Sequence, residues 1–278
     1  MLSIGEYQTL TINREAQQGF YLKDESGAEV LLPRTYITPD MHPGDPIEVF
    51  VYCDSEDKEV ATTLKPALTV GQFAYLRITD VNEFGAFADW GVPKELFIPF
   101  RNQGTRLVKG RSYVVTMYVD EFSNRLVGTT KLKPFLRHEL DASLEKGREV
   151  DLLVYARTDL GYKVIINQTY AGLVYDNEVV EPLHPGQQLK GYIKPAREDG
   201  KIDVSLHPVG HQSIEPNARK ILEKLENSGG FLPFTDKSDP DLIWETFGIS
   251  KKLFKKALGA LYRQRLVDLR EDGIYGGR

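Results

Sequence analysis

The feature that most constrains this sequence is a glycine spacing that recurs three times. In each copy two glycines are 14 residues apart, and a third follows 25 residues after the second. The three sets are Gly5, Gly19 and Gly44; Gly71, Gly85 and Gly110; and Gly147, Gly161 and Gly186. Each copy closes in a similar phrase, TLKP, KLKP or SLHP. Such regular spacing indicates an internal repeat that fills three-quarters of the chain.

Each copy has the residue pattern of short β-strands. In the second copy, aliphatic residues alternate with aromatic and basic ones along the segment QFAYLRITDV, which is the two-residue period of a strand. One face carries Ala74, Leu76 and Ile78, and the other carries Phe73, Tyr75 and Arg77. Each copy shows about five such strands in ~65 residues, a size that favours a small Greek-key barrel of the OB type over a solenoid repeat.

The second copy also resembles a known RNA-binding domain. It reads ITDVNEFGAFADW, then KELFIPF, then VKGRSYVVTMYVD, then NRLVGTTKL. This order is similar to that of the S1 domain, in which FGAFV, GLVHIS, a tight turn and a valine-rich strand ending in aspartate follow one another. The third copy repeats part of the pattern in AGLVYDNEV, and the first copy is the most diverged. The resemblance implies three S1-like barrels that bind single-stranded RNA.

The last segment changes to a helical period. PNARKILEKLEN predicts a first helix from residue 216, Ser238 is expected to cap a second, and Ser250 is expected to cap a third. LVDL, REDG and IYGG then predict a hairpin. Three helices and a hairpin resemble a winged helix. Three S1-like barrels followed by a winged helix resemble the conserved virulence factor B family, which consists of bacterial RNA-binding regulators.

The predicted fold class is therefore multidomain and mainly β, with three tandem S1-like, OB-type five-stranded β-barrels followed by an α+β winged-helix domain. The predicted boundaries are 1–66 for the diverged first barrel, 67–136 for the second, 137–212 for the third and 213–278 for the winged helix.

In the second copy, the S1 resemblance implies two stacking rings, Phe84 and Phe87, with Asp120 on the fourth strand and the basic Arg125 after it. The family's histidine position holds Ile98, which removes a polar contact to a base edge. The alternative is that Phe84 and Phe87 are barrel core. With the strand face described above, the predicted RNA-binding residues of this copy are Phe73, Tyr75, Arg77, Phe84, Phe87, Asp120 and Arg125.

The other two copies match the S1 pattern at fewer of these positions. In the third copy the ring positions are Leu160 and Lys163, with a tyrosine beside them, and the predicted RNA-binding residues are Tyr162, Lys163, Tyr175, Arg197 and Lys201. In the first copy the positions are Gln18, Tyr21, Pro33, Asp54 and Lys58. Residues 1–66 carry 5 basic and 12 acidic side chains, whereas residues 67–134 carry 9 and 6. We therefore expect the first barrel to pack or to contact protein rather than RNA.

The predicted third helix of the last domain is strongly basic. It carries Lys251, Lys252, Lys255 and Lys256, with Arg263 and Arg265 near its end and no acidic residue. In a winged helix this helix enters a nucleic-acid groove, so the four lysines are predicted phosphate contacts. The alternative is an ordinary solvated helix face.

The sequence gives little support for catalysis, a metal or a cofactor. His207 and His211 are four residues apart, but Pro208 between them breaks helical spacing, and the sequence has no phosphate-binding GKS or GKT loop. The lone Cys53 excludes an intramolecular disulfide and a multi-thiolate zinc site. No apolar run of about 18 residues and no secretory signal occur, so we expect a cytoplasmic protein with no membrane partner.

The predicted function is thus non-enzymatic binding of single-stranded RNA by a bacterial regulator of gene expression, with no cofactor. Three alternatives stay open. In the first, the barrels dock on a ribosome, RNA polymerase or RNA-processing nuclease. In the second, the winged helix binds DNA. The third and least supported alternative is a hydrolase.

Overall fold

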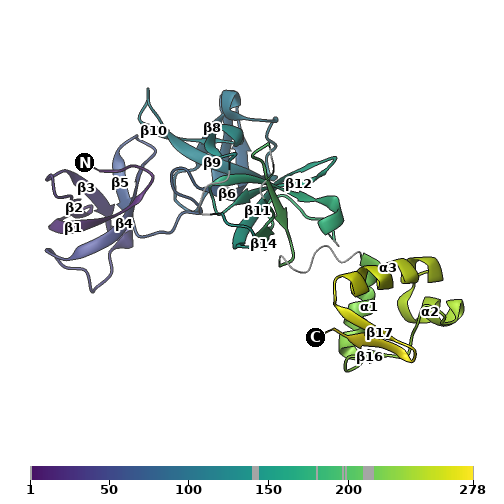
Figure 1. Cartoon of the computed structure of the whole chain (residues 1–278). Coiled ribbons are helices and arrows are strands. Elements are labelled where there is room, and N and C mark those ends of the chain that lie inside the picture. Colours follow the sequence, from purple (N-terminus) through teal and green to yellow (C-terminus); the bar gives the residue numbers. More distant parts are fainter. Residues whose placement is uncertain are drawn as a thin grey trace. The chain divides into compact units, whose positions relative to one another are not determined.

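The structure, a computed structural model, describes residues 2–139, 144–179, 181–195, 197, 199–208 and 216–277. The chain forms two compact units (Figure 1). One unit comprises Met1–Asp176 and Leu183–Val204, and the other comprises Asn177–Pro182 and Ser205–Arg278. The first unit contains fifteen strands in three five-stranded groups, one for each copy of the repeat.

The first repeat is a closed barrel in the order β1-β2-β3-β5-β4, in which a parallel pairing of β3 with β5 joins Leu31 and Val60. Its strands are β1 (Tyr7–Ala16), β2 (Gly19–Lys23), β3 (Glu29–Pro33), β4 (Pro46–Cys53) and β5 (Glu59–Thr62), with a 3-10 turn at Arg34–Tyr36. Alternate residues of β1 and β3 are buried, as the two-residue period predicts.

The second repeat has the same strand succession but a looser closure. Its sheet runs in the order β10-β9-β6-β7-β8, and the outer strands β8 and β10 lie side by side without a ladder between them in the described pairings. A Cβ atom at Gly128 of β10 would lie 2.8 Å from Cγ1 of Ile98 on β8, so glycine is needed for this approach. The strands are β6 (Phe73–Val81), β7 (Gly85–Asp89), β8 (Leu96–Pro99), β9 (Ser112–Asp120) and β10 (Arg125–Thr129), with 3-10 turns at Phe100–Asn102 and Lys133–Phe135.

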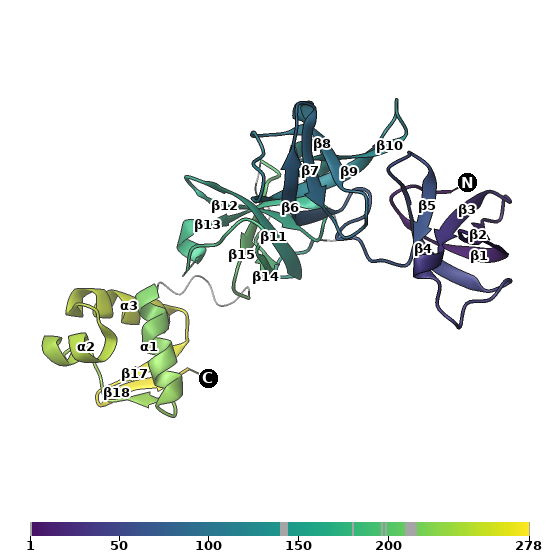
Figure 2. The ribbon, with the colours of Figure 1, turned by 180° about the vertical axis from the view of Figure 1, so that it is seen from behind.

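The third repeat is again a closed barrel, in the order β11-β12-β13-β15-β14, with β13 and β15 parallel at Gly172 and Ile202. Figure 2 shows its strands from behind, beside those of the second repeat. They are β11 (Glu149–Thr158), β12 (Gly161–Ile166), β13 (Tyr170–Tyr175), β14 (Gln188–Ile193) and β15 (Ile202–Ser205), with a 3-10 turn at Asp176–Glu178.

The second glycine of each copy is required for the same physical reason. A Cβ atom at Gly19 would lie 2.0 Å from the Leu32 carbonyl oxygen, and one at Gly161 would lie 2.1 Å from the Val174 carbonyl oxygen. Both glycines also have positive φ angles. At these points the second strand passes too close to the third strand for any side chain. The second glycine of the repeat therefore marks a backbone contact that recurs in each barrel.

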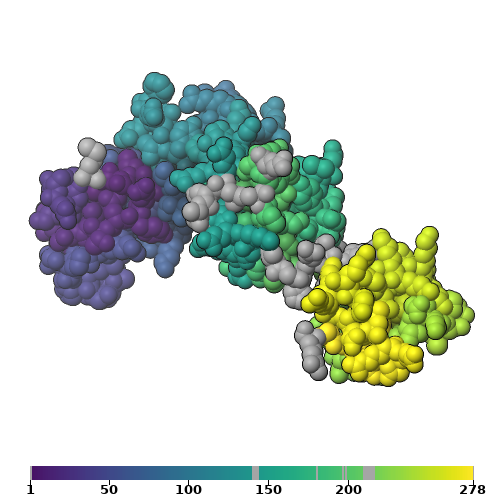
Figure 3. Space-filling model, viewed as in Figure 1, coloured from purple at the N-terminus to yellow at the C-terminus, as the bar shows by residue number. Residues whose placement is uncertain are grey.

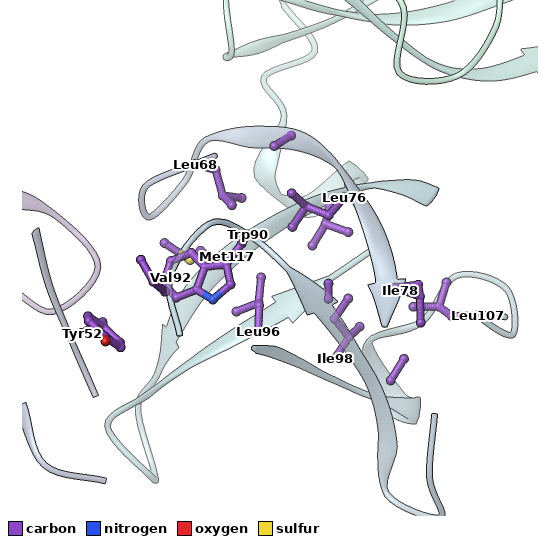
Figure 4. Close-up of a cluster of buried hydrophobic side chains, with 14 of the residues drawn as sticks. Tyr52, Leu68, Leu76, Ile78, Trp90, Val92, Leu96, Ile98, Leu107 and Met117 are labelled. Carbon is purple, nitrogen blue, oxygen red and sulfur yellow. The ribbon is translucent and has the colours of Figure 1, made fainter. Parts of the chain in front are cut away.

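The first barrel has a core of its own, but three of its residues, Phe50, Tyr52 and Val60, belong to the hydrophobic core of the second. Trp90 of the second is buried, and its ring lies 5.7 Å from that of Phe50 and 6.4 Å from that of Tyr52, both from β4 of the first (Figure 4). In Figure 3 the purple first repeat directly abuts the blue second one. The joint core is the reason that these two barrels form one unit.

The second and third repeats are joined by a smaller cluster. Phe73 packs with Leu136, Leu153 and Ile165. Its backbone N–H donates to Oε1 of Gln168 at 2.7 Å, and its carbonyl accepts from Nε2 of Gln168 at 3.2 Å. One side chain of the third barrel thus satisfies both backbone groups at the start of β6.

The second unit contains the predicted winged helix: α1 (Pro216–Asn227), α2 (Pro240–Phe247), α3 (Lys251–Arg263) and a sheet in the order β16-β18-β17. The sheet strands are β16 (Phe231–Leu232), β17 (Val267–Arg270) and β18 (Gly273–Gly276), of which β16 was not predicted. Ser250 caps α3 as expected, but the cap of α2 is Asp239, not Ser238. Proline at the first helical position makes the residue before it the cap. The predicted fold class is confirmed, and the exact domain boundaries stay predictions.

Candidate nucleic-acid interface

A groove of about 620 Å³ opens on the second barrel where the first barrel adjoins it. Four of the positions that the S1 resemblance implies line this groove together: Phe84, Phe87, Asp120 and Arg125. The fifth position, Ile98, is fully buried in the barrel core. The structure therefore gathers the predicted ring, acidic and basic residues on one surface.

Phe84 is the most open ring of the groove, with 66% of its surface exposed. The loop between β6 and β7 holds it there, because Oδ1 of Asn82 accepts the backbone N–H groups of Phe84 at 2.8 Å and Gly85 at 3.2 Å. An asparagine turn of this kind fixes the loop without using the ring. The alternative that Phe84 is barrel core is therefore wrong.

Phe87 lies half-buried on β7 beside a second ring that the sequence analysis missed. Phe97 is its direct partner on β8, and the two ring centroids are 5.3 Å apart. Both rings line the groove. LFIP and GAFAD follow each other in the sequence, but it is their register as paired strands that places the two phenylalanines opposite each other.

The cations of the groove are held by an acid of the first barrel. Arg125 donates to Asp57 at 2.5 Å, and Nζ of Lys94 lies 3.1 Å from Oδ1 of the same carboxylate. The hydrogen bond from Lys94 lowers the pKa of Asp57 below its ordinary value. Asp57 has a φ of 61° in the turn between β4 and β5, a conformation that aspartate tolerates better than most residues. The first barrel thus supplies the counter-ion of the second.

Asp120 has a local structural role. Its Oδ2 accepts from the Ser123 hydroxyl at 2.6 Å, and its Oδ1 lies 3.6 Å from a guanidinium nitrogen of Arg101. Arg101 is exposed, lines the groove and was also missed by the sequence analysis. Asp120 therefore fixes the turn that leads to Arg125 and keeps a third cation, Arg101, at the groove.

The predicted aromatic face of β6 is only partly exposed to solvent. Phe73 is 2% exposed, which corrects its prediction as an RNA-binding residue. The third barrel covers this face: a Cβ atom at Gly186 would lie 2.2 Å from Cδ1 of Tyr75. Tyr75 keeps 44% of its surface and Arg77 is exposed, but neither is among the residues that line the groove.

On the third barrel, Tyr162 is another correction, because it is 2% exposed. The Arg157 guanidinium lies 4.8 Å from the centre of its ring and donates a hydrogen bond to its hydroxyl. The ring is covered and its polar atom is paired, so Tyr162 cannot stack on a base in this conformation. Its neighbour Lys163 is exposed, as predicted for a phosphate contact.

The remaining predicted residues of the third barrel form an ion-pair network. Arg197 donates to the Tyr175 hydroxyl at 2.7 Å and to Asp199 at 2.8 Å, and Lys201 pairs with Asp199 at 3.0 Å. The hydrogen bond that Arg197 donates to Asp199 raises the pKa of Arg197, and the two cations lower the pKa of Asp199 to about 2. Carboxylates already neutralise these cations, so this surface is less open to phosphate than its sequence suggests.

The first barrel has no comparable aromatic surface at the matching positions. The Arg14 guanidinium covers the ring of Tyr21 at 3.8 Å, and Arg14 is itself paired with Glu29 at 2.8 Å. Cys53 of the first barrel is buried at the groove, and this burial raises the pKa of its thiol. Both observations agree with a packing role for this barrel and an inert cysteine.

The four lysines of α3 lie along one helix whose opposite face is buried through Phe254, Ala257 and Leu261. Nζ of Lys251 donates to the Lys237 carbonyl at 3.2 Å, and Lys255 lies 3.5 Å from Asp236. Lys252, Lys255 and Lys256 are exposed and Lys251 is half-buried. The helix therefore presents a basic face, as expected.

Within the described residues, no cluster of three or more histidine, cysteine or acidic residues could hold a metal ion. Nε2 of His207 lies 2.6 Å from a guanidinium nitrogen of Arg219, and His211 lies outside the described residues. Across the same part of the chain, no helix combines the length and apolarity that a membrane crossing requires.

Known proteins resemble both ends of this chain and its whole length. Residues 219–275 match the CvfB-like winged helix domain, and residues 4–64 match the S1 domain. YitL of Bacillus subtilis, an uncharacterised protein, is 26% identical over 276 residues, which cover 95% of this chain and 90% of that protein. Conserved virulence factor B of Staphylococcus saprophyticus is 25% identical over 280 residues, which cover 98% and 93%.

A solved structure from Streptococcus pneumoniae, a multidomain protein with nucleic acid binding domains, is 27% identical and covers 98% of both chains with a TM-score of 0.46. The predicted resemblance is thus confirmed by the winged helix and by the full-length similarity. The S1 match falls on the first barrel, the copy that the sequence analysis regards as the most diverged.

Proposed function

We propose, from the similarity of this chain to conserved virulence factor B proteins and from the groove on its second barrel, that it binds single-stranded RNA without catalysing a reaction. As the family resemblance implies, it would act in the cytoplasm as a post-transcriptional regulator of gene expression in bacteria. The observation that carries the proposal is the exposed Phe84, held at the groove by the Asn82 turn beside two further rings and three cations.

The rings favour an unpaired strand. A base inside a duplex is stacked on both faces, whereas a base of a single strand can stack on an aromatic side chain. Phe84, Phe87 and Phe97 offer such faces along one groove. Because every base has a π-face, stacking of this kind depends little on sequence.

The cations of the groove pair with Asp57 and Asp120 in the free protein and would exchange these carboxylates for the phosphates of the same strand. Arg101, which follows β8, and Arg125, at the start of β10, both line the groove, and Asp120 lies 3.6 Å from the Arg101 guanidinium. The basic face of α3 would add contacts to other phosphates of a longer RNA. Those contacts are electrostatic and independent of sequence, so affinity should fall as salt rises, at about 0.7 logarithmic units per phosphate neutralised.

The alternatives make different demands on these surfaces. A factor that docks on the ribosome, a polymerase or a nuclease would use the barrels against protein, and a DNA-binding regulator would use α3 in a duplex. Neither requires the Phe84 ring to contact a nucleobase. Titration with single-stranded RNA, single-stranded DNA and duplex DNA at two salt concentrations separates them.

The test of the proposal is the double substitution Phe84→Ala and Phe87→Ala. Loss of stacking on two rings should weaken binding of single-stranded RNA by about tenfold or more, since each stacked base is worth ~1–3 kcal/mol. Phe84→Ala alone should leave the melting temperature unchanged because the ring is exposed. Tyr21→Ala in the first barrel is the matched control and should leave affinity unchanged. Normal affinity in a folded Phe84→Ala and Phe87→Ala protein would remove the RNA site from this groove.

A further inference from the structure

The tip of the hairpin between β9 and β10 carries a phenylalanine with no structural role in the described contacts. Phe122 is 99% exposed, more than any other large hydrophobic side chain among the described residues. In Figures 1 and 2 the loop next to β10 projects from the second repeat. Single exposed hydrophobic residues are common on protein surfaces, so what distinguishes Phe122 is the full exposure of its ring between two residues that line the groove.

The hairpin fixes its tip without help from that ring. Oδ2 of Asp120 accepts from the hydroxyl of Ser123 at 2.6 Å and from its backbone N–H at 3.3 Å. The Asn124 backbone N–H donates to the Asp120 carbonyl at 2.8 Å, and Asn124 takes the left-handed conformation with a φ of 52°. The turn is therefore closed by polar groups, and the Phe122 side chain points into solvent.

The corresponding turns of the other two barrels carry no aromatic residue. The turn between β4 and β5 reads DSEDK from residue 54, and the segment between β14 and β15 reads KPAREDGK from residue 194. The exposed ring thus belongs to the one barrel that also exposes Phe84 at a groove. This coincidence links Phe122 to the surface of the second barrel rather than to the repeat.

The hairpin is also a wall of that groove. Asp120, Ser123 and Arg125 line it, so Phe122 stands at its rim between two of these residues. Phe84 comes from the loop between β6 and β7, and Phe122 comes from the loop between β9 and β10. In OB-type barrels these are the two loops, between strands one and two and between strands four and five, that border the bound oligonucleotide.

We propose that Phe122 stacks on a base of the bound RNA that lies outside the groove, so that the strand leaves the groove over the β9–β10 hairpin. This inference rests on the proposed function and extends it. It assigns the second barrel a longer binding site, with inner bases on Phe84, Phe87 and Phe97 and at least one outer base on Phe122.

The test uses the full chain and two labelled oligoadenylates. OB-type sites span about 4–16 nucleotides, so one strand of about four nucleotides fits the groove and one of about twelve extends beyond it. Phe122→Ala should weaken binding of the longer strand at least fivefold and leave binding of the short strand unchanged. Phe122→Tyr should retain affinity because it keeps the ring, whereas Phe122→Leu should lose it as Phe122→Ala does.

Phe84→Ala is the reference variant that distinguishes the two proposals, because it should weaken the binding of both the short and the long strand. Unchanged binding of the longer strand by Phe122→Ala, with Phe84→Ala still impaired, would overturn the inference and leave the proposed function standing. Full affinity of Phe122→Leu would overturn stacking at this position. Unchanged binding by both Phe122→Ala and Phe84→Ala would overturn the proposed function as well.

Discussion

The first and second barrels follow one backbone plan and expose different surfaces. Both place a glycine where the second strand crosses the third, and both bury alternate residues of the same strands. At the matching ring position, however, the first barrel has Tyr21 covered by Arg14, whereas the second has Phe87 beside Phe97 in an open groove. The first barrel also contributes Asp57 to that groove.

The difference shows that repetition preserved the backbone and left the surface free to change. The core of a small barrel tolerates only the residues that fill it, while its outer face can lose a ring or gain an acid at little cost in stability. In this chain the first barrel has become a supporting wall of the site on the second. The following predictions test that division of roles.

The largest effect should come from the core that the two barrels share. Trp90→Ala removes a buried ring that contacts Phe50 and Tyr52 and whose N–H donates to the Lys94 carbonyl at 2.6 Å. Replacing a buried tryptophan by alanine costs about 3–5 kcal/mol, so urea unfolding should show a loss of this size. Trp244→Ala, at a position that is 63% exposed in the winged helix, is the matched control and should change stability by less than about 0.5 kcal/mol.

A second test asks whether phosphate contacts lie outside the barrels. Changing Lys251, Lys252, Lys255 and Lys256 to glutamate should weaken binding of all long RNAs by roughly tenfold and flatten the salt dependence, since each lost contact removes ~0.7 from the slope. Sequence preference should not change, because phosphates carry no sequence information. Circular dichroism should show an intact fold. Unaltered affinity would leave α3 as an ordinary solvated helix face.

Removing the carboxylate that the first barrel supplies to the groove should have a smaller effect, and it should raise RNA affinity instead of lowering it. Asp57→Asn keeps a residue that tolerates a positive φ but removes the charge that holds Arg125 and Lys94. Exposed ion pairs are worth about 0–1 kcal/mol, so RNA affinity should rise about two- to fivefold in a titration at low salt. Asp45→Asn, which removes an acid of the same barrel that does not line the groove, is the control. A fall in affinity would mean that Asp57 positions the cations instead of competing for them.

The smallest effect concerns the third barrel. The folded pKa of Asp199 is about 2, below the ordinary value near 3.9, because Arg197 and Lys201 donate hydrogen bonds to it. Its contribution to stability is therefore present above about pH 4 and is lost as the pH falls toward 2. Carboxyl-carbon NMR should show this late titration, and Asp199→Asn should remove that part of the acid dependence. A normal midpoint would mean that the network does not persist in solution.

Much of the fold could be predicted because each element depends on local pattern. The second glycine of each copy marks a close backbone approach, the two-residue period marks strands, and Ser250 marks the start of α3. The S1 resemblance names Phe84, Phe87, Asp120 and Arg125 as binding positions, and the structure places these four residues in one groove.

The errors share a physical cause, which is contact that the residue pattern of a single strand does not show. Alternation along β6 separates two faces but cannot show that another barrel covers Phe73. The charge of Arg197 is visible in the sequence, but its pairing with Asp203, at 3.4 Å, requires the folded turn. Phe97 and Arg101 were missed because the resemblance names neighbouring positions but not these two. The strand pairing shows that Phe97 lies opposite Phe87, and both residues line the same groove.

The Gln168 side chain has a consequence for how this protein can be divided. It satisfies both backbone groups of Phe73, a residue 95 positions earlier, from a different barrel. A fragment that ends after the second barrel would leave that N–H and carbonyl without their partner and would expose the Phe73 ring to water. The three copies can be counted separately in the sequence, but they are not interchangeable parts. A useful fragment for expression or crystallisation should therefore keep the second and third barrels together.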